Sequence, residues 1–274
     1  MIPTTGSELA LRGAQGRIGA AISQASARTG VDFTYLFNQA RIESSLNPNA
    51  RARTSSATGL YQFIEQTWLG TVRRHGAEHG MGWAANAIQR GQNGRYYVAD
   101  PQMRRAILDL RRNPEASASM AAEFASDNGR YLESRLGRPA ESVDLYLAHF
   151  LGAGGAARFL RAHDANPGGA AASVLPAAAR ANRWVFYNRD GSPRSFAEIR
   201  ERFAARIGGA SGPAAPARQT MPDVQIAALD TNTRLAALEP GFTLGVGKAD
   251  PAVSVNAEYA RLAYLMLAGM GGAE

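Results

Sequence analysis

Apolar residues recur at helical spacing along most of the chain up to residue 207. In residues 15–28, Ile18, Ala21, Ile22 and Ala25 fall on one face of a helix. Similar spacing predicts helices at 32–45, 64–74, 101–112, 115–136, 141–150, 153–163 and 195–207. The alternation that is typical of strands is scarce. The pattern therefore predicts a mainly α domain.

The stretches between these helices differ in composition. Residues 46–63 are polar and are expected to form a loop with a small β-hairpin or strand-like pairing, whereas residues 75–100 are rich in Gly, Asn and Gln and are expected to form a variable loop. After residue 208, Gly, Ala and Pro predict a flexible linker at 209–250. A short C-terminal helix is expected at 251–274, so the domain itself comprises residues 1–208.

One carboxylate lies on the apolar face of its predicted helix. Phe33, Leu36, Phe37 and Ala40 form that face, and Glu43 follows Leu36 by seven residues. Seven residues return to within about 20° of the starting direction in an α-helix. Because an apolar setting disfavours the ionised form of a carboxyl group, Glu43 is a candidate general acid. A rim residue whose carboxylate reaches solvent is the alternative that this helix alone leaves open.

The residues that follow Glu43 form a compound motif. Ser44 comes directly after it, Pro48 ends the helix, and a polar loop leads to the run Gly59-Leu60-Tyr61-Gln62. These segments resemble two motifs of the soluble-type lytic transglycosylases, whose SLT domain shares a fold with goose-type lysozyme. The family has Glu-Ser at a helix end and then Gly-Leu-Met-Gln, in which Tyr61 here replaces Met.

A third motif departs from the family's pattern. The family has Ala-Tyr-Asn before a Gly-rich turn, and the nearest match here is the run Ala148-His149-Phe150 before such a turn. In the family, the tyrosine hydrogen-bonds the catalytic acid. His149 occupies its position here and Tyr146 lies one helical turn earlier, so which of them supports Glu43 stays open.

The resemblance extends over residues 15–206, and residues 182–194 are similar to a proteobacterial branch of the family. It implies a lysozyme-like helical fold and cleavage of the β-1,4 bond between N-acetylmuramic acid and N-acetylglucosamine in peptidoglycan. Glu43 would act first as acid and then as base, while the muramyl O6 closes a 1,6-anhydro ring without water. The implied substrate-binding residues are Ser44, Tyr61, Gln62, Phe63, Tyr146, His149, Phe150 and Tyr187, with core packing as the alternative for each aromatic.

Two other functions stay open. A hydrolytic muramidase normally needs a second carboxylate about 5–10 Å from the first, and no Asp or Glu occurs between Ser44 and Ile64. Glu65 comes next, but its place at the start of a helix is typical of a surface residue that complements the helix dipole. Glu123 is likewise expected in solvent. The other alternative is a non-catalytic peptidoglycan-binding assembly factor, which the altered third motif would suit.

Composition limits the cofactors and partners. The chain has 274 residues, no cysteine and four histidines, so disulfides and thiolate metal sites are excluded. His75 and His79 are spaced as helical zinc ligands, but the neighbouring glycines and the lone Glu78 argue against a zinc site, and we expect no metal and no cofactor. The net charge of +7 suits anionic peptidoglycan strands, and no nucleic-acid motif accompanies it.

The two ends of the chain bear on localisation. Residues 1–7 lack the basic and apolar regions of a signal peptide, and no segment is apolar over the length of a membrane span. We expect a periplasmic or exported protein, with a signal removed or a specialised export route. The expected processes are cell-wall remodelling and local wall opening during envelope assembly. The C-terminal helix either packs on the domain or docks to secretion or flagellar machinery.

Overall fold

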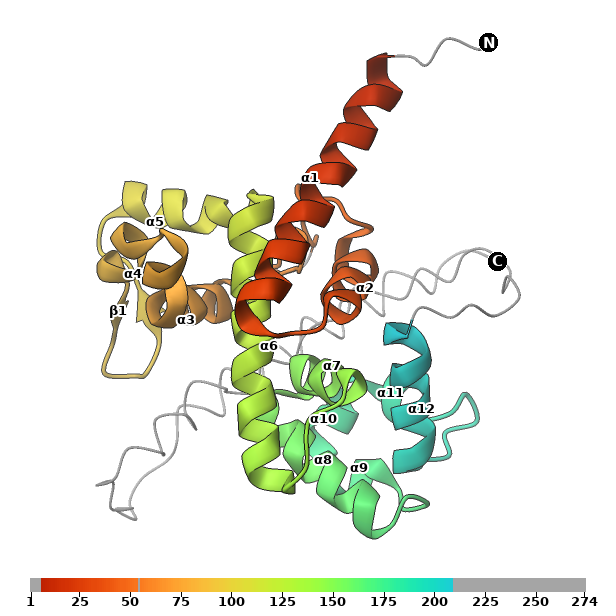
Figure 1. Ribbon diagram of the computed structural model, residues 1–274. Helices are drawn as coiled ribbons and strands as arrows, with labels where there is room; N and C mark the ends of the chain where they lie inside the picture. Colours follow the sequence, from red (N-terminus) through yellow and green to blue (C-terminus); the bar gives the residue numbers. More distant parts are fainter. Residues whose placement is uncertain (1–5, 54, 209–274) are drawn as a thin grey trace, which may run out of the picture. The chain divides into compact units, whose positions relative to one another are not determined.

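The structure is a computed structural model in which residues 6–53 and 55–208 are described (Figure 1). The chain divides into two compact units, and the boundary falls between Arg130 and Tyr131. Among the described residues, the first unit contains 6–130 with 207–208, and the second contains 131–206. The predicted linker and C-terminal helix lie outside the described residues.

The first unit is mainly helical. Its elements are α1 (Gly6–Thr29), α2 (Phe33–Ser44), α3 (Glu65–His75), η1 (Gly76–His79), α4 (Gly82–Ala87), β1 (Gln89–Arg90), β2 (Tyr96–Tyr97), α5 (Pro101–Asp109), η2 (Leu110–Arg112) and the first part of α6 (Pro114–Leu136). Each helix predicted in this part of the chain is present. The prediction of a mainly α, lysozyme-like fold is confirmed.

Side-chain caps determine where several of these helices begin. Asp32 accepts a hydrogen bond from a first-turn amide of α2 at 2.7 Å, and Asp100 accepts two at the start of α5. Asn113 does the same for α6 at 2.8 Å. Pro114 is then the first residue of α6, where its missing N–H leaves no helical hydrogen bond unmade.

The core of the first unit follows the predicted apolar faces. The four α1 residues named above are each at most 5% exposed. Trp68 is fully buried in α3, and its indole N–H donates to the carbonyl of Ile107 in α5 at 2.8 Å. Phe63 packs edge-on against Trp68 with a centroid distance of 5.3 Å. These contacts fix α3 and α5 beside the loop that carries the second motif.

The prediction of a variable loop at 75–100 is wrong. η1, α4 and the antiparallel pair β1–β2 lie there (Figure 1). Ala84 and Ile88 are buried, so a polar composition hid a short apolar face. Gln66 of α3 holds the hairpin, because its side chain bonds both the N–H and the carbonyl of Tyr96 at 2.9 Å.

The second unit is also helical. It contains the rest of α6, then α7 (Ser142–Leu151), α8 (Ala153–Ala165), α9 (Ala171–Val174), α10 (Pro176–Ala181), α11 (Arg183–Phe186) and α12 (Phe196–Ile207), whose last residue is counted with the first unit. The helices predicted at 141–150, 153–163 and 195–207 are confirmed. α9 to α11 were not predicted, because each is too short to produce a periodic pattern.

Aromatic contacts form much of the second unit's core. Phe159 of α8 packs edge-on against Phe196 of α12 with a centroid distance of 5.1 Å, and Phe150 of α7 lies 5.1 Å from Phe203 of α12. Phe186 is fully buried. α12 therefore packs on both α7 and α8 through large rings, each of which contributes about 0.5–1.5 kcal/mol beyond its buried area. Within the described part of the chain, no helix combines the length and apolarity needed to cross a bilayer.

A buried carboxylate joins three segments of the second unit. Asp144 is fully buried, and its Oδ2 accepts from the Glu141 N–H at 3.1 Å and from Arg138 Nη1 at 2.6 Å. Its Oδ1 accepts from Arg200 Nη2 of α12 at 3.3 Å. The hydrogen bond to Asp144 raises the pKa of Arg138. One side chain thus caps α7 and holds α12 to it.

We expect Asp144→Asn to lower the free energy of unfolding by about 2 kcal/mol, because the amide keeps the volume but loses the charge that both arginines need. Asp164→Asn is the control, since its half-exposed side chain contacts only His163 at 3.2 Å among the interactions described. It should change the free energy by less than about 0.5 kcal/mol. Urea denaturation measures both, and equal effects would contradict the assigned role.

Candidate active site

Glu43 lies at the C-terminal end of α2. It is the penultimate residue of that helix, and Ser45 and Leu46 follow with φ values of 53° and 62°, which turn the chain away. The Glu43 side chain is half-buried, and its Oε1 atom is fully buried. A rigid helix therefore presents this carboxyl group, as the apolar pattern predicts.

Ser44 connects the first motif to the second. Its Oγ lies 2.9 Å from the carbonyl oxygen of Leu60 and 3.0 Å from that of Ala40. Both atoms are acceptors, so the single hydroxyl hydrogen is shared between them. The Glu43–Ser44 end of α2 is thereby bonded to the run that begins at Gly59.

The loop that carries the second motif folds back on itself. Thr58 forms isolated bridges with Arg51 and Phe63, which confirms the predicted strand-like pairing. Gln62 has a φ of 45°, and its side-chain amide donates to the carbonyl of Gly59 at 2.9 Å. A non-glycine residue with positive φ is uncommon and stores backbone strain at a candidate site. Here the side chain of Gln62 helps to hold that conformation.

Arg111 clamps this loop from η2. The residue is 8% exposed, and its Nη1 donates to the carbonyls of Ser56 at 2.7 Å and Phe63 at 3.0 Å, while Nε donates to Leu108 at 2.9 Å. Burial lowers its pKa to about 10. Gly59 has a φ of 86°, and a Cβ built there would lie 1.9 Å from the Arg111 carbonyl oxygen. Only glycine fits that approach.

Two aromatic residues of the second motif are in the core. Tyr61 is 1% exposed and Phe63 is 5% exposed. Phe63 also contacts Phe124 of α6 with a centroid distance of 6.3 Å. The hydroxyl of Tyr61 is buried and has no hydrogen-bond partner among the described residues, and burial raises its pKa well above the ordinary value. In this structure Phe63 packs the loop against α3 and α6, and the Tyr61 side chain is also buried.

Most carboxylates of the first unit that the structure describes are held by a cap or an ion pair. Glu65 pairs with Arg104 at 2.5 Å, and Asp109 pairs with Arg112. The expectation that Glu123 lies in solvent is wrong, because its side chain is 12% exposed and lies 2.8 Å from His79 Nε2. The ion pair with Arg104 gives Glu65 a structural partner.

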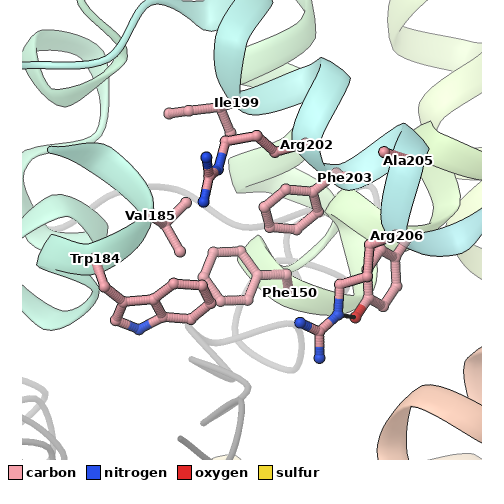
Figure 2. Close-up of a pocket in the computed structure, with 9 residues that line it drawn as sticks. Phe150, Trp184, Val185, Ile199, Arg202, Phe203, Ala205 and Arg206 are labelled. Carbon is pink, nitrogen blue, oxygen red and sulfur yellow. Dashed lines mark hydrogen bonds between the residues drawn. The ribbon is translucent and has the colours of Figure 1, made fainter. Parts of the chain in front are cut away.

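A separate cavity lies within the second unit. It has a volume of about 280 Å³, and Figure 2 shows its lining: Tyr146, Phe150, Trp184, Val185, Ile199, Arg202, Phe203, Ala205 and Arg206. Phe150 belongs to the third motif, and Tyr146 lies one helical turn before it on α7. The Tyr146 hydroxyl accepts from Arg206 Nε at 3.0 Å, and Trp184 meets the Phe150 ring edge-on at 6.5 Å. The lining combines aromatic faces with two guanidinium groups.

The remaining predicted site residues of this unit lie near the cavity lining in sequence. His149 is 6% exposed, and its ring stacks parallel to that of Tyr146 with centroids 6.1 Å apart. Tyr187 is half-buried, and the guanidinium of Arg183 lies 4.6 Å above its ring. Neither residue is part of the cavity lining. The structure thus brings Tyr146 and Phe150 together in one cavity.

Sequence reasoning missed seven of the nine residues that line this cavity. Five of the seven lie on α12, among them Arg202, Phe203 and Arg206, and the other two are Trp184 and Val185. The spacing of Phe203 and Arg206 on a predicted helix was visible, but nothing in the sequence indicated that this helix packs against the third motif. Tertiary packing alone supplies that information.

The first unit is mainly helical and presents the Glu43 carboxyl group at the end of α2. Residues 20–153 match the model of the transglycosylase SLT domain. This segment is therefore an SLT domain, as the motifs predicted, and it runs from α1 to the first residue of α8. Such domains act on peptidoglycan, outside the cytoplasm, in lytic transglycosylase-type cleavage.

We expect Arg111→Met to lower the free energy of unfolding by about 3 kcal/mol, because three carbonyls, one of them in a buried hydrogen bond, lose their charged donor. Arg112→Met is the matched control, since Arg112 contacts Asp109 within one turn at the surface, where such pairs contribute at most about 1 kcal/mol. Chemical denaturation compares the two variants. Equal losses would show that the clamp has no special role.

We expect Tyr61→Phe to leave the free energy of unfolding unchanged or to raise it by up to about 1 kcal/mol, because it removes a buried hydroxyl without a partner. Tyr146→Phe removes a hydroxyl that is bonded to Arg206 and should cost about 1 kcal/mol. Thermal and urea unfolding test the pair. A clear loss in Tyr61→Phe would reveal a polar partner.

Proposed function

We propose that this protein is a peptidoglycan lytic transglycosylase that cleaves the MurNAc-β-1,4-GlcNAc bond and releases 1,6-anhydromuramyl products, with Glu43 as general acid and base. The observation that carries this proposal is the hydrogen bond between Ser44 and Leu60 at 2.9 Å. It joins the helix end that bears Glu43 to the second motif of the SLT domain. Two segments that are separated in the sequence thus form one connected feature.

The proposed reaction uses Glu43 twice. Its carboxylic acid donates a proton to the glycosidic oxygen, and the bond from that oxygen to C1 of the muramyl residue breaks. The muramyl O6 then forms a bond to C1 and gives its proton to the Glu43 carboxylate, which restores the acid. Atoms and charge balance without water, so one carboxyl group is sufficient.

The ion pair formed by Glu65 supports a mechanism with one catalytic carboxyl group. Hydrolytic glycosidases usually use a pair of carboxyl groups. Glu65, the first acidic residue after Glu43, pairs with Arg104 in this structure, and its Oε1 accepts from Arg104 Nη2 at 2.5 Å. A residue engaged in this way is a poor candidate for a nucleophile or a water-activating base. This argument favours the transglycosylase over a hydrolytic muramidase.

The cavity of the second unit supports binding of a sugar or its peptide substituent. Phe150 and Trp184 offer ring faces for apolar sugar surfaces, and the guanidinium groups of Arg202 and Arg206 suit carboxylates. Muramyl residues carry a lactyl group to which an acidic peptide is attached. We therefore propose that this cavity binds substrate within the second unit, to which the predicted residues His149 and Tyr187 also belong. Ser44 and Gln62 are the proposed substrate-binding residues of the first unit.

The biological setting follows from the substrate. Glycan strands of the wall are cut during remodelling and where envelope complexes cross it, and we propose one of these roles in the periplasm or after export. A secretion or flagellar complex is the proposed partner. The basic character of the chain, with a net charge of +7, suits an anionic polymer.

We expect Glu43→Gln to reduce the release of soluble muropeptides from purified sacculi by at least about 100-fold, because the amide cannot donate the proton. Mass spectrometry of the wild-type products should show muropeptides lighter by one water molecule than the hydrolysis products. Hydrated products would identify a muramidase instead.

Glu65→Gln is the control for this experiment, because it removes a carboxylate that pairs with Arg104 outside the proposed reaction. It should keep cleavage within a few-fold of wild type. A loss in Glu65→Gln equal to that in Glu43→Gln would point to a two-carboxylate mechanism. Binding of sacculi without any cleavage by the wild-type protein would favour a non-catalytic binding factor.

A further inference from the structure

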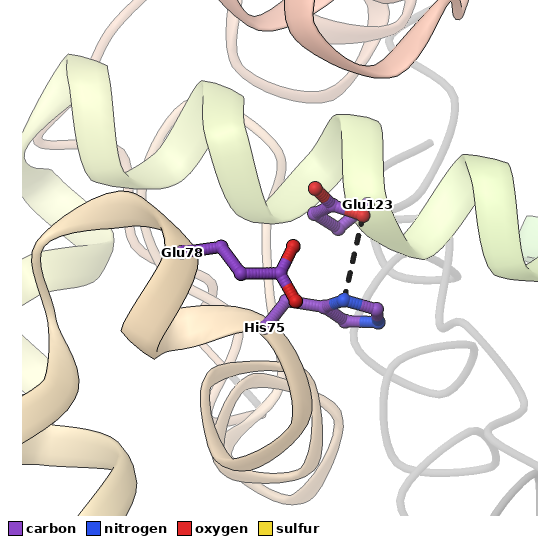
Figure 3. Close-up of side chains that lie close together, drawn as sticks. All are labelled: His75, Glu78 and Glu123. Atoms are coloured by element: carbon purple, nitrogen blue, oxygen red, sulfur yellow. Dashed lines mark ion pairs between the residues drawn. The ribbon is translucent and has the colours of Figure 1, made fainter.

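A cluster of histidines and carboxylates lies where α3 and η1 meet α6 within the first unit. His75 is the last residue of α3, Glu78 and His79 belong to η1, and Glu123 and Asp127 lie one helical turn apart on α6. Figure 3 shows His75, Glu78 and Glu123 directed toward one another from the two sides. Donor atoms of these three residues all lie within 4.8 Å of one another. The proposed reaction uses none of them.

The hydrogen bonds of His75 determine what its second nitrogen can do. His75 Nε2 lies 2.9 Å from Asp127 Oδ2, and a carboxylate at that distance accepts a hydrogen from the ring. In the neutral imidazole, Nδ1 then carries a lone pair. It faces Glu123 Oε2 at 3.4 Å, so two electron-rich atoms oppose each other. A cation between them, either a proton on Nδ1 or a metal ion, removes the repulsion.

The surroundings are those of a supported metal ligand set. Carboxylates that accept from the second nitrogen of a ligating histidine fix its tautomer and orientation. Asp127 does this for His75, because its Oδ2 lies 2.9 Å from His75 Nε2. His79 Nε2 lies 2.8 Å from Glu123 Oε1, the oxygen that does not face His75. The side chains of His75 and Glu123 are thus each oriented by a hydrogen bond to the atom that does not face the other ligand.

We propose that His75 Nδ1 and the carboxylates of Glu78 and Glu123 bind one divalent transition-metal ion, with Zn²⁺ as the best fit. Tetrahedral zinc with bonds of about 2.0–2.2 Å separates its ligand atoms by about 3.3–3.5 Å. The distance from His75 Nδ1 to Glu123 Oε2 is 3.4 Å. Glu78 is exposed and completes the set from the solvent side, where a water molecule can take the fourth position.

Charge and ligand type both favour this class of ion. One imidazole and two carboxylates neutralise a divalent cation. The charge of Asp127 is balanced separately by Arg74 at 3.3 Å and Arg130 at 2.5 Å. A nitrogen ligand selects zinc-like ions over Ca²⁺ and Mg²⁺, which prefer oxygen. In the sequence, the neighbouring glycines and the lone Glu78 argued against zinc at His75 and His79, because the second carboxylate, Glu123, comes from α6, 48 residues after His75.

The proposed ion would join α3 and η1 to α6. It would tie the start of the 75–100 region, which forms helices and a hairpin, to α6. Binding to the folded state alone raises stability by mass action. The inference concerns a structural site and is independent of whether the protein cleaves peptidoglycan.

The test is a titration of the full chain, stripped of metal by a chelator and then dialysed, with ZnCl₂. Isothermal titration calorimetry should give one ion per chain at micromolar concentration, and the melting temperature should rise with Zn²⁺ but not with equal Ca²⁺ or Mg²⁺. Glu78→Gln should weaken binding at least about ten-fold without disturbing the fold, because Glu78 is exposed. His75→Gln should abolish binding, and Co²⁺ loading should give visible absorption bands that both variants lose.

Glu115→Gln and His163→Gln are the matched controls. Glu115 is an exposed residue in the first turn of α6, and His163 lies beside Asp164 in the second unit. Both should bind zinc as the wild type does. Absence of saturable binding by the wild type would overturn the proposal, as would equal binding by Glu78→Gln. Because Glu78 is exposed, zinc binding by Glu78→Gln still tests the proposal if His75→Gln fails to fold.

Discussion

The buried guanidinium of Arg111 is the contact on which the candidate site depends most. It bonds the carbonyls of Ser56 and Phe63, which lie on either side of the run Gly59-Leu60-Tyr61-Gln62. A charged donor shared among backbone carbonyls makes stronger hydrogen bonds than a neutral one, so a single side chain can define the path of a loop with little regular structure. Gly59 then approaches the Arg111 backbone too closely for any other residue. The carbonyl of Leu60 in this loop in turn accepts a hydrogen bond from Ser44, at the helix end that bears Glu43.

The sequence was sufficient for the helices and for the position of Glu43, because both depend on local periodicity. It was insufficient wherever distant segments meet. Arg111 reads as one of many arginines in a helical pattern, and nothing local indicates that it is buried. Glu123 was expected in solvent for the same reason, yet histidines from α3 and η1 surround it. Short elements such as α4 were missed, because a few buried alanines do not give a detectable period.

The second and third motifs differ in how their aromatic residues are used. Tyr61 of the second motif is 1% exposed, so its side chain is part of the core. The third motif differs in another way. Its His149 stacks on Tyr146, and Tyr146 contacts Arg206 of α12, so the motif and a helix outside the matched segment form one packed group. The packing of the third motif therefore extends beyond residue 153.

The backbone conformation of Gln62 bears on the free energy of ligand binding. The side chain of Gln62 bonds the carbonyls of Gly59 and Ala50, so the residue closes its own loop internally and leaves little conformational freedom there. Ordering a flexible loop around a ligand costs free energy at the moment of binding, whereas a loop that is ordered beforehand avoids that cost. A glycan strand that meets this surface would find it already shaped. Its affinity would then reflect the contacts made, with little loss of chain entropy to offset them.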